Sequence, residues 1–117
     1  MTAAEKTRLL AERVMGWCRH KTFPDAYVSN SEGAGLMTQF AANVADWEPL
    51  TNLSHAGEVL EAMIAKGYEF DAQDCGVGKY KAWFRGNGAR VHAFAPLLAT
   101  AICHAAMLAE GVKEEEL

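Results

Sequence analysis

The hydrophobic period of the chain changes at Gly67, and this change limits the available folds more than any other feature. Before Gly67, apolar residues recur at the spacing of one helical face: Leu53, Ala56, Leu60, Met63 and Ile64. Asn52 suits the capping position of that helix, and Lys66-Gly67 supply a basic last turn and a stop. After Gly67, apolar and polar residues alternate over residues 68–73, which is typical of a half-buried strand. A helix followed at once by a strand predicts a mixed α and β domain.

Two further alternating segments follow, and a turn joins them. Lys79–Arg85 carries apolar residues at every second position, and Ala89–Phe94 comes directly after Gly86-Asn87-Gly88. Asn-Gly between two alternating segments is a strong hairpin signal. The three strands are therefore expected to pair antiparallel.

Helical spacing also marks both ends of the chain. Residues 2–19 predict an amphipathic helix that ends before Phe23-Pro24, because a residue that precedes proline avoids the α region. The last helix is predicted from Pro96 to Gly111, since proline is favoured in the first helical turn. Its many alanines favour a close approach to a sheet.

Residues 21–49 give mixed signals and are predicted to be mostly irregular. Ser29–Gly35 is a turn cluster, which Tyr27-Val28 and Leu36-Met37 flank as two short strands. The alternative is a short helix, because apolar residues also recur at helical spacing: Leu36, Phe40, Val44 and Trp47. Trp17 and Trp47 are expected to pack in the core.

The predicted order of elements is helix, irregular segment, helix, three strands and helix. Because the helices must bury their apolar faces on the antiparallel sheet, the fold class is α+β, a layered α-β-α sandwich with a small sheet and about three helices. At 117 residues the chain is expected to form one globular domain, residues 1–112, followed by an acidic tail, residues 113–117.

Charge and hydropathy exclude several classes of partner. Fifteen acidic against 11 basic residues give a net charge of −4, so we expect no binding to duplex nucleic acid or to an anionic membrane. The apolar runs are much shorter than the ~20 residues of a membrane span, and the N-terminus lacks the order of a secretory signal. A cytoplasmic protein is expected. Three widely spaced cysteines predict reduced thiols: Cys18, Cys75 and Cys103.

The sequence carries no catalytic signature. No Gly-x-Ser-x-Gly turn or Gly-Lys-Ser/Thr phosphate loop is present, and the four histidines lack metal-ligand spacing: His20, His55, His92 and His104. Glu69 and Asp71 share one strand face, which solvation of that face explains without acid–base catalysis. We therefore predict no catalytic residues, no metal site, no cofactor and no enzymatic activity.

The predicted hairpin carries the one distinctive cluster of side chains. Between Gly76 and Ala109 there is no acidic residue, so the basic side chains there create a local positive field on an acidic protein. Alternation places several of them on the same face as a tryptophan. The candidate binding residues are Lys79, Lys81, Trp83, Arg85, Arg90 and His92.

Three interpretations of this cluster remain open. The simplest is that a helix covers Trp83 and the lysines extend past its edge. The second is a surface for a protein partner, because Trp and Arg dominate interface hot spots. The third is an anion or nucleotide site in which Trp83 stacks on a base.

Four segments resemble the phage ABA sandwich domain family. They are Val14-Met15-Gly16-Trp17, Pro49–Leu53, Glu58–Glu61 and the alanine-rich Ala95–Ala109. Gly57 and His104 depart from that pattern, which commonly has a large aromatic residue and an arginine there. The resemblance implies a layered α-β-α fold and a phage or prophage origin, and it carries over no activity and no functional residue.

The leading hypothesis is a small non-enzymatic phage accessory protein that binds a host protein or protein complex in the host cytoplasm and inhibits a defence or regulatory system. One alternative is a homo-oligomer that sequesters a nucleotide-like small molecule. The other is an enzyme with an unrecognised site.

Overall fold

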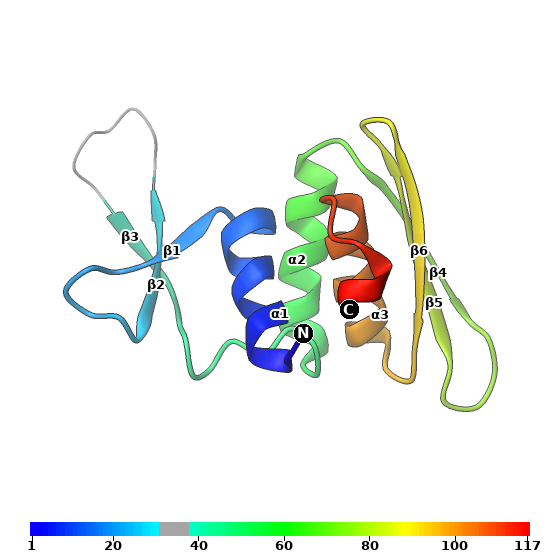
Figure 1. The fold of residues 1–117 in the computed structure, drawn as a ribbon, viewed down its shortest axis with the longest axis horizontal. Coiled ribbons are helices and arrows are strands. Elements are labelled where there is room, and N and C mark those ends of the chain that lie inside the picture. Colours follow the sequence, from blue (N-terminus) through cyan, green and yellow to red (C-terminus); the bar gives the residue numbers. More distant parts are fainter. Residues whose placement is uncertain (31–37) are drawn as a thin grey trace.

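Within residues 1–30 and 38–117, which the computed structural model describes, three α-helices stand between two three-stranded antiparallel sheets (Figure 1). The helices are α1 (Ala3–Leu9), α2 (Leu53–Ala65) and α3 (Leu98–Ala109). The N-terminal sheet contains β1 (Trp17–Arg19), β2 (Ala26–Asn30) and β3 (Thr38–Asn43). The C-terminal sheet contains β4 (Glu69–Asp74), β5 (Tyr80–Gly86) and β6 (Ala89–Ala95). The expected α+β sandwich is confirmed.

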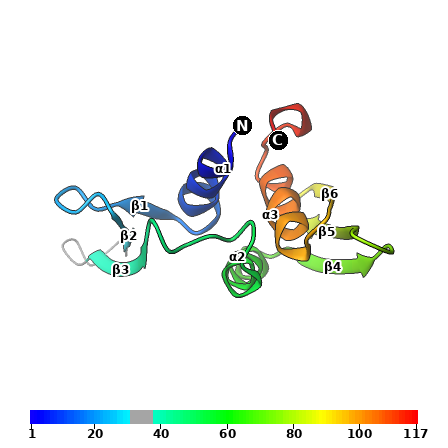
Figure 2. The same ribbon diagram turned by 90° about the horizontal axis from the view of Figure 1, so that it is seen from below.

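Helix α3 lies at the centre of the hydrophobic core. It packs between α2 and the C-terminal sheet (Figures 1 and 2). Most of its side chains are buried, and most of these are small: Ala99, Ala101, Ile102, Cys103, Ala105, Ala106 and Met107. Small side chains let the helix axis approach neighbours on several sides, as the run of alanines predicts.

Helices α2 and α3 have nearly the boundaries that the sequence predicts. Asn52 caps α2, and its side-chain oxygen accepts a hydrogen bond from the His55 amide at 3.1 Å. Helix α3 begins at Leu98, two residues after Pro96, and ends before Gly111. Both helices are confirmed.

The predicted hairpin is also confirmed, with a two-residue turn. Gly86 pairs with Ala89, so Asn87 and Gly88 form the turn at φ 50° and 80°. Positive φ at both positions is the geometry that matches the twist of the flanking strands, and Asn-Gly tolerates it best. Strand β5 is central and pairs antiparallel with β4 and β6.

The first helix is shorter than predicted, and Trp17 and Cys18 lie in a strand. Helix α1 continues as one wide turn over Leu10–Val14, where the Met15 amide donates to the Leu10 carbonyl at 3.0 Å. Gly16 then takes a φ of 71°, which ends the helix and directs the chain into β1. The prediction over residues 2–19 was wrong at its end because Trp17 and Cys18 fit the helical spacing by coincidence.

The prediction that residues 21–49 are mostly irregular was wrong, because this segment supplies two strands of the N-terminal sheet, and its described part contains no short helix. Tyr27-Val28 lies in β2 as expected, whereas Phe40 lies in β3, so the alternative of a helix through Phe40 is wrong. The Leu36-Met37 strand and most of the turn cluster fall outside the described residues. Pairing with β1 and β3 explains why a weak local pattern still forms strands.

Three aromatic rings join the N-terminal sheet to the helices. Trp17 and Trp47 lie 4.8 Å apart between ring centroids, and Trp17 lies 5.9 Å from Tyr27. Trp47 is 3% exposed, and its Nε1 donates to Glu58 Oε2 on α2 at 2.8 Å. The expected core packing is confirmed for Trp47, whereas Trp17 is half-buried and packs against the edge of the core.

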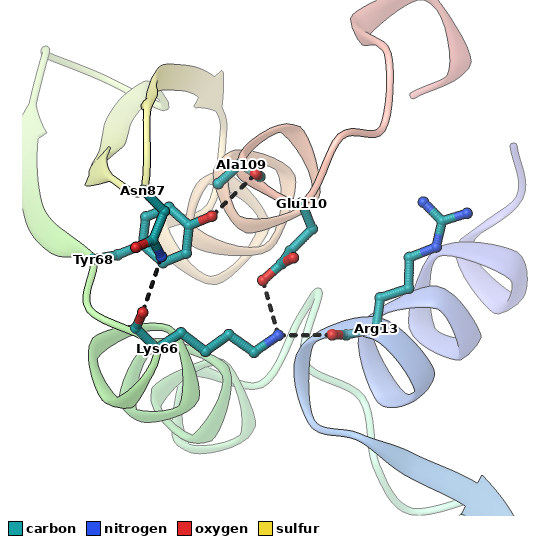
Figure 3. Close-up of polar contacts among 6 residues, drawn as sticks. All are labelled: Arg13, Lys66, Tyr68, Asn87, Ala109 and Glu110. Atoms are coloured by element: carbon teal, nitrogen blue, oxygen red, sulfur yellow. Dashed lines mark hydrogen bonds and ion pairs between the residues drawn. The ribbon is translucent and has the colours of Figure 1, made fainter.

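Lys66 ties together the ends of three elements (Figure 3). Its ammonium group donates to the Arg13 carbonyl at 2.7 Å and to Glu110 Oε1 at 2.8 Å. Its own carbonyl accepts from Asn87 Nδ2 at 2.9 Å, so the hairpin turn is attached to the same point. Close by, the Tyr68 hydroxyl donates to the Ala109 carbonyl at 3.2 Å.

The C-terminal residues end in contact with the core of the domain. Glu114–Glu116 form one turn of 3-10 helix with exposed side chains. Leu117 is half-buried and packs against the core.

One polar contact between α1 and α3 depends on pH. Lys6 Nζ donates to His104 Nε2 at 3.1 Å, which requires a neutral imidazole. Burial, and to a smaller extent the charge of Lys6, lowers the pKa of His104 below 6.5.

Substitution of Ala105 by Leu should destabilise the fold. Ala105 is 0% exposed on the crowded α3, so the larger side chain should cost about 1–3 kcal/mol in the free energy of unfolding. Urea denaturation would measure the loss. The matched control is Ala65→Leu at the exposed end of α2, where we expect almost no change, and equal stability of the two variants would contradict the close packing of α3.

Acidification should weaken the fold through His104. Because its folded pKa lies below the unfolded value of 6.5, its contribution is complete above that value and is lost as pH falls through the folded pKa. Urea denaturation between about pH 7.5 and about pH 5 should show a decline that His104→Gln reduces. His92→Gln, at an exposed site, should keep the wild-type decline, and a His104→Gln slope equal to that of the wild type would exclude this account.

Candidate functional site

The C-terminal sheet has one face against α3 and one face without a helix. Ala82 and Phe84 of β5 are 0% exposed on the inner face, so the residues that alternate with them along the strand point the other way. In both views, no described helix lies beyond this sheet (Figures 1 and 2). We call this second side the outer face.

The register of the strands arranges the outer face in three rows. In each row, one residue of β5 has a direct neighbour on β4 and another on β6. The rows are Glu69–Arg85–Arg90, Asp71–Trp83–His92 and Gln73–Lys81–Phe94. Direct cross-strand neighbours have Cβ atoms only about 4.5–5.5 Å apart, so these side chains form one continuous surface.

Cations lie over the aromatic rings of this surface. Lys81 Nζ lies 5.1 Å from the centroid of the Trp83 ring and 5.5 Å from that of Phe94. Lys79, from the loop before β5, reaches the same Phe94 ring at 4.7 Å. The His92 ring meets Phe94 edge-on at 5.6 Å. The aromatic groups and the cations therefore form one mixed cluster.

A shallow hollow lies within the outer face. Its volume is about 290 Å³, and its lining includes five of the six candidate residues. These residues are Lys81, Trp83, Arg85, Arg90 and His92, together with Val91. The structure thus brings together the residues that sequence alternation selected, with Lys79 at the margin.

No described helix covers Trp83, contrary to the simplest interpretation of the sequence. Its side chain is half-buried by its neighbours on the outer face, and Phe94 beside it remains 46% exposed. The sequence analysis missed Phe94, although its alternation with Arg90 and His92 along β6 was a sufficient signal.

The face is not free of acidic groups in three dimensions. Glu69 and Asp71 lie on β4 directly opposite Arg85 and Trp83, and Arg85 Nη2 bonds to Glu69 Oε2 at 3.1 Å. Both side chains of this pair are largely exposed, at 50% and 75%, so the pair contributes little to stability. The rows hold three cations, from Lys81, Arg85 and Arg90, against two carboxylates. The local positive field expected from the acid-free segment is therefore partly neutralised, because pairing with β4 brings acidic residues from earlier in the chain.

The other candidate groups remain apart from this face. His20, His55 and His104 accept hydrogen bonds in three separate places, and no group of three potential metal ligands occurs among the described residues. Burial raises the pKa of Cys103 to about 12, and its Sγ donates to the Pro49 carbonyl at 3.2 Å, so it packs as the buried thiol that the sequence predicted.

No helix in the described part of the chain is long and apolar enough to cross a bilayer.

Comparison with known proteins supports the family resemblance. The model of the phage ABA sandwich domain matches residues 8–107. The chain also resembles a phage protein from Bacillus cereus ATCC 14579, known from a 2.0 Å crystal structure, with a TM-score of 0.68 and 17% sequence identity. That alignment covers 97% of this chain and 91% of the other, so it shows a shared fold. None of the curated proteins compared with this chain matches it.

The family match extends from the end of α1 through all six strands to the buried part of α3. The chain belongs to the phage ABA sandwich domain family.

Proposed function

We propose that this phage-family protein acts without catalysis and binds a host protein or protein complex through its outer face. The observation that carries the proposal is a tryptophan and a 46% exposed phenylalanine on a sheet face that no described helix covers. Aromatic residues and arginine supply most of the binding energy in protein interfaces. Here both types lie within three adjacent rows.

The charges of the outer face favour a protein partner over a polyanion. Glu69 and Asp71 lie in the same rows as the cations, and they would repel a phosphate backbone. A protein surface can complement both signs. We further propose that the bound partner belongs to a host defence or regulatory system in the cytoplasm, a role that suits a small phage protein without a recognised catalytic group.

The alternative function is sequestration of a nucleotide-like molecule by an oligomer. The hollow of about 290 Å³ supports it, because Trp83 and the cations that line it could contact a base and a phosphate. The two carboxylates count against it. Denaturing the purified protein after incubation with a nucleotide pool, and identifying any released ligand by mass spectrometry, would distinguish the two functions.

The leading proposal predicts that a double substitution on the outer face abolishes partner binding. Trp83→Ala with Arg85→Glu removes the central ring and reverses a neighbouring charge. Quantitative mass spectrometry of proteins captured from host lysate should then show a host protein that the wild type retains and the variant loses. With that partner purified, we expect the dissociation constant to rise by a factor of about 30 or more, because truncation of a hot-spot residue costs about 2 kcal/mol or more.

The matched control carries Phe23→Ala with Arg13→Glu. Phe23 is 67% exposed, and the Arg13 side chain is also exposed, so both changes lie outside the outer face. The control should bind as the wild type does, and thermal unfolding should show that both variants are folded. If the two double variants retain the same proteins, the outer face is not the binding surface.

A further inference from the structure

A second cavity lies next to α1 and the N-terminal sheet, on the opposite side of the helices from the outer face. Its volume is about 340 Å³, near the lower end of the range of about 300–1,000 Å³ that small-molecule sites occupy. Helix α1, strands β1 and β2 and the segment 44–51 contribute to its wall. Much of the lining is apolar, from Ala3, Ala4, Val44, Ala45, Trp47 and Leu50.

Two residues with hydrogen-bond donors line this cavity side by side. Arg19 of β1 and Tyr27 of β2 are direct cross-strand partners, so their side chains lie next to each other on one face of the N-terminal sheet. Both line the cavity. Arg19 makes no ion pair with any residue in the described part of the chain, and its guanidinium stays charged at all relevant pH values.

Tyr27 is buried, yet its hydroxyl is not used by the fold. The residue is 2% exposed, and its hydroxyl makes no hydrogen bond to the described residues. In the same part of the chain, every side-chain polar atom that is fully enclosed has a partner. The Tyr27 hydroxyl therefore keeps some exposed area, and the residue lines the cavity. A buried donor without a partner is costly unless a ligand or water satisfies it.

We propose that this cavity binds a small aromatic monocarboxylate. The carboxylate accepts hydrogen bonds from the Tyr27 hydroxyl and the Arg19 guanidinium, and the ring packs against Trp47, Val44 and Leu50. Glu48 also lines the cavity, and its negative charge disfavours a second anionic group on the ligand. This site is independent of the outer face and of the partner proposed for it.

Three probes with the same ring test the role of charge. Indole-3-acetate carries a carboxylate, indole carries no charge, and tryptamine carries an ammonium group. Titration of the labelled protein, followed by the amide signals of Tyr27, Ala45 and Thr51 in NMR spectra, should show the tightest binding for indole-3-acetate. We expect indole to bind about tenfold more weakly, because a hydrogen bond to a charged group contributes about 1.5 kcal/mol or more.

Substitutions in the cavity separate the polar and apolar parts of the site. Tyr27→Phe and Arg19→Gln should each weaken indole-3-acetate about tenfold and leave indole unchanged, because only the carboxylate uses these donors. Ala4→Leu, on the exposed side of α1, should weaken both probes by filling the cavity. Trp83→Ala, on the outer face, is the matched control and should change neither affinity.

Several results would overturn this assignment. They are equal affinities for the three probes, no binding at millimolar concentrations, or signal changes that Trp83→Ala removes. Should Tyr27→Phe fail to fold, Arg19→Gln at an exposed position decides the question, since an unchanged affinity for indole-3-acetate in that variant also contradicts the proposal.

Discussion

The close packing of the alanine-rich α3 is the constraint on which the rest of the structure depends. Ala101, Ala105 and Ala106 are 0% exposed, and the helix contacts α2 as well as β5 and β6. Alanine loses no side-chain entropy on burial and permits short distances between helix and sheet. All three helices consequently lie on one side of the C-terminal sheet, and its other side stays open (Figures 1 and 2). The outer face has no described helix against it because α3 and the helices that pack with it all lie on the inner side of the sheet.

A few polar contacts then fix the ends of the elements around this core. The ammonium group of Lys66 reaches the end of the first helix and the end of α3, while its carbonyl holds Asn87 in the hairpin turn (Figure 3). Aromatic packing among Trp17, Trp47 and Tyr27 holds the N-terminal sheet to the rest of the molecule. The two candidate sites thus lie on opposite sides of the helices (Figure 1). A ligand in the proposed cavity site need not interfere with the partner proposed for the outer face.

The outer face combines features that suit selective protein recognition. Trp83 and Phe94 offer apolar area, Lys81 lies near both rings, and Glu69 and Asp71 border them with negative charge. A surface with charges of both signs disfavours a uniform polyanion and selects a surface of matching pattern, because charge complementarity mainly sets specificity. These features support the proposal of a protein partner over nucleic acid.

Local patterns in the sequence determined the elements whose signals are strong and short-ranged. The periodicity of α2 and α3, the Asn52 cap and the Asn87-Gly88 turn were all predicted, because their causes lie within a few neighbouring residues. Strand alternation likewise selected Lys81, Trp83 and Arg85 for one face. The first helix was predicted to be too long, because one glycine, Gly16, ends it and gives only a weak signal in the sequence. Strand β1 forms by pairing with β2, which no local pattern reveals.

Only the tertiary structure decided what surrounds the predicted residues. Whether a helix covers Trp83 depends on which face of the sheet the helices pack against. Alternation along the strands divides the residues between two faces but does not say which face is covered. The acidic residues beside Arg85 come from a strand that precedes it in the chain, so their proximity follows from register rather than composition. The cavity at Tyr27 arises where α1, two strands and the segment 44–51 meet. Contacts between segments far apart in the chain leave no local pattern. For that reason the elements and the residues on one strand face could be predicted, whereas the acidic neighbours of that face and the cavity could not.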